Sequence, residues 1–259
     1  MKGGVGSRES EVGRGEAGVT LLELLIAMTA VSLLVMGMVL SLRVALSAMD
    51  KSVDRLTTNR RASSVQRILE DQVAGIMPVK ALCAAAPDNP LSVVPFFQGD
   101  PQAMRFVSAY SMQQGSRGLP MILEFHVIPG ENGLGVRLVV NEHIYTGPRS
   151  TGAFCGGVLP DETGGMLPVF YPIQTSTSSF VLADKLAYCR FAYRFVSTDP
   201  RQQPPLPPAW LVHWPKRLLP NAIRVEMAPL QADSARVQVL TMTMPVHVTK
   251  DPMKMDYGY

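Results

Sequence analysis

Glu23 is a carboxylate at the start of a long apolar segment, and its position calls for a cation nearby. It directly precedes 19 consecutive uncharged residues, Leu24–Leu42. Burying a charge in such surroundings costs at least ~2.5 kcal/mol unless the charge is paired. Cleavage of the chain after Gly18 would create a new amine at Val19, four residues before the carboxylate. We therefore expect an electrostatic pair between such an amine and Glu23, which is chemistry suited to assembly.

The residues around this carboxylate form a recognisable motif. The segment Gly18-Val19-Thr20-Leu21-Leu22-Glu23 resembles the prepilin cleavage motif of type IV pilins and type II secretion pseudopilins. The resemblance implies that residues 1–18 are a leader, and that a peptidase cuts after Gly18 and methylates the amine of Val19. It also implies that Glu23 engages that amine on a neighbouring subunit. Val19 stands where the family usually has Phe, and three acidic residues balance the three basic residues of the leader.

Other residues with catalytic or ligating side chains are scattered. The sequence has no G-x-S-x-G elbow, H-E-x-x-H pair or phosphate-binding loop, so we expect no enzyme activity and no cofactor. Gly130–Gly133 and Asp161–Gly165 contain oxygen ligands that suit calcium, but their composition favours ordinary turns, and no metal site is expected. The four histidines lack a metal-binding spacing, and each is expected to be a solvent-exposed strand residue: His126, His143, His213 and His247.

The three cysteines differ in their surroundings. They are widely spaced and contain no C-x-x-C pair, which excludes a zinc or thioredoxin pattern. Cys189 falls on the apolar face of an alternating strand and is expected to be a buried free thiol. Cys83 and Cys155 lie in segments of loop character flanked by Gly and Pro. An oxidising compartment would allow these two to form a disulfide.

The segment after Glu23 predicts a membrane-spanning helix. As a helix, residues 24–42 would be ~28 Å long, close to the roughly 30 Å hydrocarbon core of a bilayer. An ordinary secretory signal peptide would have a shorter apolar stretch and a cleavage site of small residues. Ala45-Leu46-Ser47 could be taken for such a site, but the apolar run is too long to fit that interpretation.

The helical pattern continues beyond the apolar run. Apolar residues recur at three- and four-residue intervals up to Val73, and Gly75 followed by Pro78 predicts the end of the helix. We expect one helix over residues 19–75 whose second half packs on a globular head, with a solvated turn or local bend possible at 59–62. No Gly/Pro/Ser linker separates its two halves.

Residues 76–259 have the pattern of a β-rich head. Short apolar and β-branched runs alternate with Gly, Pro and Asn, which predicts a mainly antiparallel sheet and an α+β fold of pilin type. The proline-rich segment 200–208 is expected to be an extended surface loop, because it has few backbone donors. At least six strands are expected, within residues 104–110, 121–128, 135–141, 185–195, 223–227 and 237–248.

The order of elements in the head carries a second resemblance. A strand over Leu186–Phe195, a tryptophan-bearing strand at Trp210–Pro215 and a strand beginning Leu219-Pro220 follow one another. This order, with the helical segment Arg67–Asp71, is similar to J-type minor pseudopilins of type II secretion. Minor type IV pilins that initiate pili have similar elements.

Composition limits the partners. Charged residues make up 17% of the chain, below the roughly 25% that is usual, which suggests a surface that meets other protein. The net charge of +3 is spread along the chain without a block of Lys and Arg, so nucleic acid is not an expected partner.

Together these features predict a minor pseudopilin at the tip of a type II secretion pseudopilus, assembled by helix packing and the Glu23–amine pair. Its partners would be other minor and major pseudopilins, prepilin peptidase, the inner-membrane assembly platform and the lipid bilayer. The chain would cross the inner membrane once, with a cytoplasmic N-terminus and a periplasmic head. A minor type IV pilin that primes pilus assembly is one alternative, and a signal-anchored periplasmic enzyme or binding protein is another.

Overall fold

The computed structural model describes residues 19–84, 91–112, 116–161, 164–197, 207–230, 239–248 and 250–254. Contacts group the chain into two units, Met1–Asp54 and Arg55–Tyr259. Helix α1 (Leu21–Ala74) begins in the first unit and ends in the second. Residues 59–62 are helical, so the prediction of a possible turn at that position is wrong. A proline-rich loop is expected at residues 200–208. Residues 200–206 lie outside the described residues, and residues 207–208 have no regular structure.

The first unit contains one helix that is long and apolar enough to cross a membrane. Within Leu21–Met49, an 18-residue window has a mean hydropathy of 2.4. Every large apolar side chain in it is between 48% and 84% exposed. Exposure of such a surface to water is unfavourable. Soluble proteins rarely expose contiguous apolar patches of more than a few hundred Å².

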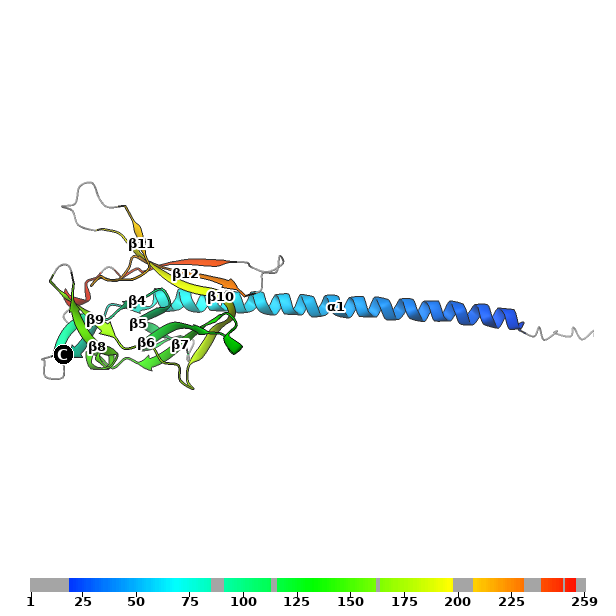
Figure 1. Ribbon diagram of the computed structural model, residues 1–259, viewed down its shortest axis with the longest axis horizontal. Helices are drawn as coiled ribbons and strands as arrows, with labels where there is room; N and C mark the ends of the chain where they lie inside the picture. The colour runs from blue at the N-terminus through cyan, green and yellow to red at the C-terminus, as the bar shows by residue number, and fades with distance from the viewer. Residues whose placement is uncertain are drawn as a thin grey trace, which may run out of the picture. The chain divides into compact units, whose positions relative to one another are not determined.

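The second unit is built on a nine-stranded antiparallel sheet, and it confirms the predicted α+β fold (Figure 1). Its strand order is β1-β5-β6-β7-β10-β12-β13, with β4 paired to β5 and β11 paired to β10. The strands are β1 (Ile76–Met77), β4 (Gln98–Gly99), β5 (Ala103–Ser111), β6 (Ser116–Pro129), β7 (Val136–Ile144), β10 (Phe180–Phe195), β11 (Ala209–Leu211), β12 (Ala222–Pro229) and β13 (Leu240–Pro245).

All six expected strands are therefore present, and seven short ones join them. The additions include two hairpins outside the main sheet, β2 (Lys80–Ala84) with β3 (Leu91–Pro95), and β8 (Cys155–Pro160) with β9 (Met166–Phe170). The described residues of the second unit also form three short helices: η1 (Glu131–Gly133), α2 (Pro148–Gly152) and η2 (Pro252–Lys254).

One face of the sheet, called here the helix face, packs on the last turns of α1. Val65, Leu69 and Val73 are buried there, at the helical spacing that the sequence predicts. Alternate residues of β10 belong to the same core, since successive strand residues point to opposite faces. The largest buried partners on the sheet are aromatic or branched: Phe106, Phe125, Phe191, Tyr193 and Ile223.

The end of α1 is fixed against β5. The Ser108 hydroxyl donates a hydrogen bond to the Gln72 carbonyl at 3.1 Å, and the Ala109 amide donates to the Gly75 carbonyl at 2.8 Å. Any Cβ at Gly75 would overlap the Tyr110 ring and the Ser108 hydroxyl. Glycine is therefore required here for close approach as well as for ending the helix.

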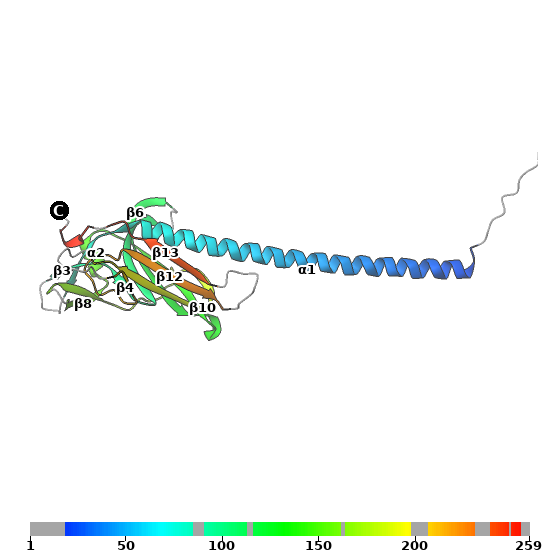
Figure 2. The same ribbon diagram turned by 90° about the horizontal axis from the view of Figure 1, so that it is seen from above.

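The other face of the sheet is divided into two halves. Over β5, β6 and β7 it is covered by the two hairpins, and this forms a second core around Val107, Ile122 and Phe96. Over β10, β12 and β13 the exposed residues alternate with residues of the helix-face core. Figure 2 shows these three strands side by side, as their pairing requires.

A disulfide joins the two hairpins, between Cys83 of β2 and Cys155 at the start of β8. Both cysteines lie in strands and are buried, so the loop character expected for these two segments is wrong. The Gly and Pro residues around both cysteines indicated loops, but they flank or interrupt strands that are only five or six residues long. Cys189 is the buried free thiol that its place in an alternating strand predicts, and burial raises its pKa to about 12.

Loss of this disulfide should destabilise the second unit. Cys83→Ser and Cys155→Ser are each expected to lower the free energy of unfolding by about 2–5 kcal/mol, because the bond closes a long loop in the unfolded chain. The unit contains both tryptophans of the chain, Trp210 and Trp214, so chemical denaturation followed by fluorescence reports on it. Mass spectrometry of non-reduced peptides should find the pair linked and Cys189 free. A linked Cys83–Cys189 peptide would contradict the assignment.

Candidate functional site

The candidate assembly site lies at the start of α1. Gly18 lies outside the described residues. Val19 precedes the helix and is 70% exposed, and Glu23 is an exposed residue of its first turn. Within the described part of the chain, the Glu23 carboxylate has neither a hydrogen bond nor an ion pair. A single copy of the chain therefore leaves this carboxylate available to a cation from elsewhere.

Thr20 adds a residue that the sequence reasoning missed. The Glu23 amide donates a hydrogen bond to the Thr20 hydroxyl at 3.3 Å, and the Leu24 amide donates to the Thr20 carbonyl at 3.2 Å. Thr20 is thus the N-cap of α1. The spacing of Thr20 and Glu23 is that of a capping box, S/T-x-x-E, which was visible in the sequence. A carboxylate in the first turn also stabilises a helix through the helix dipole. Glu23 thus has a local role in addition to the expected one.

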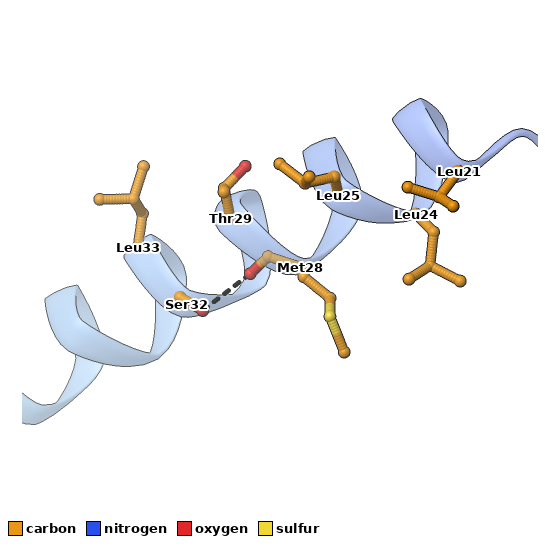
Figure 3. Close-up of a pocket in the computed structure, with 7 residues that line it drawn as sticks. All are labelled: Leu21, Leu24, Leu25, Met28, Thr29, Ser32 and Leu33. Carbon is orange, nitrogen blue, oxygen red and sulfur yellow. Dashed lines mark hydrogen bonds between the residues drawn. The ribbon is translucent and has the colours of Figure 1, made fainter.

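A shallow apolar groove follows directly after this turn (Figure 3). Leu24 and Met28 extend from one side of the helix, while Leu25, Thr29 and Leu33 extend from another. Its two hydroxyls are satisfied internally: Ser32 donates to the Met28 carbonyl at 2.7 Å, and Thr29 donates to the Ile26 carbonyl at 2.9 Å. The groove therefore presents almost no unsatisfied polar group to whatever covers it.

The second unit contains a buried charged cluster that the sequence reasoning did not find. Arg105 of β5 and Glu124 of β6 are paired in register, and their side chains are only 1% and 6% exposed. Arg105 Nη2 lies 2.6 Å from Glu124 Oε1, and Arg105 Nε donates to the same oxygen at 2.8 Å. Asn141 donates to the other carboxylate oxygen at 3.0 Å, and His143 Nε2 lies 3.1 Å from it.

This cluster connects the sheet to the segments that cover it. The Arg105 guanidinium donates to the Gln98 side chain at 2.6 Å and to the Tyr171 carbonyl at 3.2 Å. It also lies over the rings of Phe154 and Phe170, 5.2 and 5.0 Å from their centroids. Hydrogen bonds to Glu124, Gln98 and Tyr171 and the two ring contacts give this cation five partners, and they fix the β8–β9 hairpin on the sheet.

The ionised state of the pair follows from these contacts. Burial lowers the pKa of Arg105, although the Glu124 carboxylate opposes this effect. Burial by itself would raise the pKa of Glu124, but hydrogen bonds from Asn141 and the Arg105 charge outweigh it and hold this pKa below its usual value. Both groups are therefore charged at neutral pH. The cluster is closed by its own partners, and this arrangement suits packing better than proton transfer.

His126 overturns the expectation that each histidine is exposed on a strand. It is only 6% exposed. Neither ring nitrogen has a hydrogen-bond partner within the described residues. His143, His213 and His247 are exposed, and only His143 of these three lies in a strand.

The burial of His126 predicts a pH dependence. Burial lowers its pKa, so the unfolded chain, whose histidines titrate near pH 6.5, binds the proton more readily than the folded chain. Stability is therefore full above about pH 6.5 and falls as the pH drops toward the lowered pKa. His126→Phe should flatten the curve between pH 7 and 5, where most carboxylates stay ionised, whereas the exposed His247→Gln should not. An unchanged slope in His126→Phe would contradict this assignment.

In the two acidic segments that contain possible calcium ligands, the described carboxylates have partners within the chain. The Gly165 amide donates to the Asp161 carboxylate at 2.6 Å and closes the β8–β9 hairpin. Glu131 forms an ion pair with Arg137, and the Gly130 amide donates to the Gly135 carbonyl at 2.9 Å. Among the described residues, no group of three or more His, Cys, Asp or Glu side chains is placed to hold a metal ion.

No protein-family model matches this chain, and no curated protein sequence matches it. The apolar N-terminal helix followed by an antiparallel sheet is compatible with a pilin-like architecture.

Proposed function

We propose that this chain is a minor pseudopilin, a structural subunit at the tip of the short periplasmic filament of type II secretion. The observation that carries the proposal is α1, which presents an entirely exposed apolar surface over Leu21–Met49. Its first turn holds Glu23, whose carboxylate has no partner among the residues that the structure describes. A subunit that polymerises through this helix needs both features. The apolar surface supplies the packing, and the carboxylate sets the register.

The exposed apolar surface of α1 needs an apolar environment both before and after assembly. Before assembly, the bilayer covers it, since its length and composition suit the hydrocarbon core. After assembly, the corresponding helices of neighbouring subunits cover it. In this proposal the N-terminus faces the cytoplasm, and the second unit lies in the periplasm. An oxidising periplasm also suits the Cys83–Cys155 disulfide.

The carboxylate makes assembly directional. In a monomer, Glu23 near the membrane surface can remain hydrated. Once the helix moves into a filament core, the carboxylate loses water and needs a cation. The methylated amine of Val19 on the adjacent subunit would supply one, after prepilin peptidase removes residues 1–18. The inner-membrane assembly platform would then lift the paired subunits, so the work of the chain is structural and needs neither a cofactor nor catalysis.

The proposal is tested by the N-terminus of the mature protein. N-terminal sequencing and mass spectrometry of the chain from membranes should give a mature chain that begins at methylated Val19. A mature chain that begins near Ala48 would contradict the proposal and favour a signal-anchored periplasmic protein. Genes for a secretion ATPase, a secretin and other pseudopilins beside this one would favour secretion, whereas pilus retraction genes would favour a minor type IV pilin.

A further inference from the structure

The uncovered half of the sheet carries an unusual set of side chains. The surface lies on β10, β11 and β12, on the side away from α1, and we call it the arginine face. Its residues on β10 and β12 alternate along each strand with buried core residues, so their side chains point away from the core. They are Tyr188, Arg190, Arg194, Trp210, Arg224 and Glu226.

Strand register places these residues next to one another. Arg190 pairs with Glu226 across β10 and β12. On β10, Arg194 lies between Trp210 of β11 and Ala222 of β12. Arg224 pairs with Ala192, whose small side chain leaves room above it. Three arginines from two neighbouring strands thus share one surface.

The arginines outnumber the carboxylates on this face. Glu226 is the shared partner of two of them, with Arg190 Nε at 3.4 Å and Arg224 Nη1 at 3.5 Å. Arg194 is exposed, and its guanidinium has no hydrogen bond or ion pair within the described residues. One carboxylate against three guanidinium groups leaves an excess of two positive charges.

The face also holds an ordered aromatic group. The Arg224 guanidinium lies 3.8 Å from the centroid of the Trp210 ring, reaching across β10 above Ala192. Arg190 lies 4.7 Å from the centroid of the Tyr188 ring. Stacking of this kind fixes a guanidinium in place while its donors stay available, so little conformational entropy is lost when a carboxylate binds.

We propose that the arginine face binds an acidic segment of a partner protein, with Arg194 as its main anchor. Arginine and tryptophan are the side chains most often found at the centre of protein–protein interfaces. A carboxylate of the partner would pair with Arg194 beside Trp210, while the Arg190–Glu226–Arg224 group would exclude water around it. The proposal does not depend on the role of Glu23.

Two other anionic partners fit less well. Nucleic acid binding rests on many phosphate contacts, typically about 6–10, whereas this face offers three arginines around an acidic side chain. Glu226 lies in the middle of the face and would repel a uniform polyanion or an anionic lipid surface. A protein segment can place carboxylates at Arg194 alone and neutral residues at Glu226.

The test uses the full chain in detergent micelles and a fluorescein-labelled peptide of about ten residues in which glutamate alternates with serine. Alternation places the carboxylates on one side of an extended peptide. Fluorescence anisotropy should show binding that weakens as salt increases, while the glutamine version of the peptide should not bind. Arg194→Glu should weaken binding roughly tenfold or more, and Trp210→Ala should weaken it by a smaller factor.

The matched control is Arg149→Glu, which makes the same charge change at an exposed arginine of α2. It should bind the peptide within about twofold of the unchanged protein. Equal losses in Arg194→Glu and Arg149→Glu would overturn the proposal, as would absence of peptide binding. Tighter binding to phosphatidylglycerol vesicles or a single-stranded oligonucleotide, with the same sensitivity to Arg194→Glu, would also overturn it.

Discussion

Replacing Glu23 by glutamine or valine should leave leader cleavage unchanged and reduce the chain in assembled filaments by roughly tenfold or more. The pair between Glu23 and a neighbour's amine would lie in a dry filament core. Removing one partner of a buried charge pair typically costs about 3–5 kcal/mol, and each 1.4 kcal/mol corresponds to a factor of ten. Quantitative immunoblots of filament and membrane fractions, combined with N-terminal sequencing, measure assembly and cleavage separately.

Thr20 provides the control that separates assembly from helix capping. Glutamine can replace glutamate at the third position of a capping box, so Glu23→Gln removes the charge and retains the cap. Thr20→Ala does the reverse, at an expected cost of about 1 kcal/mol of helix stability. We expect Glu23→Gln to fail in assembly and Thr20→Ala to assemble. Normal assembly of Glu23→Gln would contradict the proposed charge pair.

Periodicity revealed those elements in which one face is apolar. The alternation in β10 and β12 and the spacing of Val65, Leu69 and Val73 each predict a buried face, and the structure confirms both. These patterns work because only one side of each element meets the helix-face core. The strand order could not be predicted in the same way, since β10 pairs with both β7 and β12 and these contacts join residues far apart in the sequence.

Short strands and buried charges were missed for a different reason. The strands β2, β3, β8 and β9 have only five or six residues, and the last three contain Gly or Pro, so no clear period develops. In β5 and β6 both faces are covered, and an almost continuous apolar run conceals the alternation. Arg105 interrupts the run in β5, and Glu124 interrupts the run in β6. That interruption is the signal that could have suggested Arg105 and Glu124 as a buried pair.

Breaking the Arg105–Glu124 pair should destabilise the second unit more than any surface substitution. Arg105→Met leaves a buried carboxylate without its cation, and Glu124→Gln leaves a buried guanidinium without its anion. Each is expected to cost about 3–5 kcal/mol, because the remaining charge stays desolvated. Denaturant unfolding of the full chain in detergent, followed by tryptophan fluorescence, measures this loss. Arg137→Ala is the control, since its ion pair with Asp184 lies at the surface and should matter little.

The double variant Arg105→Met with Glu124→Leu, compared with the single variants Arg105→Met and Glu124→Leu, distinguishes a coupled pair from two independent losses. If the charges act on each other, the double variant should be less destabilised than the sum of the two single ones, by at least about 1 kcal/mol. It should still fall short of the unchanged protein, because Asn141, Gln98 and the Tyr171 carbonyl lose buried partners. Strict additivity would show that the pair contributes through packing alone. Partial recovery would show that the charge of each residue is tolerated only because the other is present.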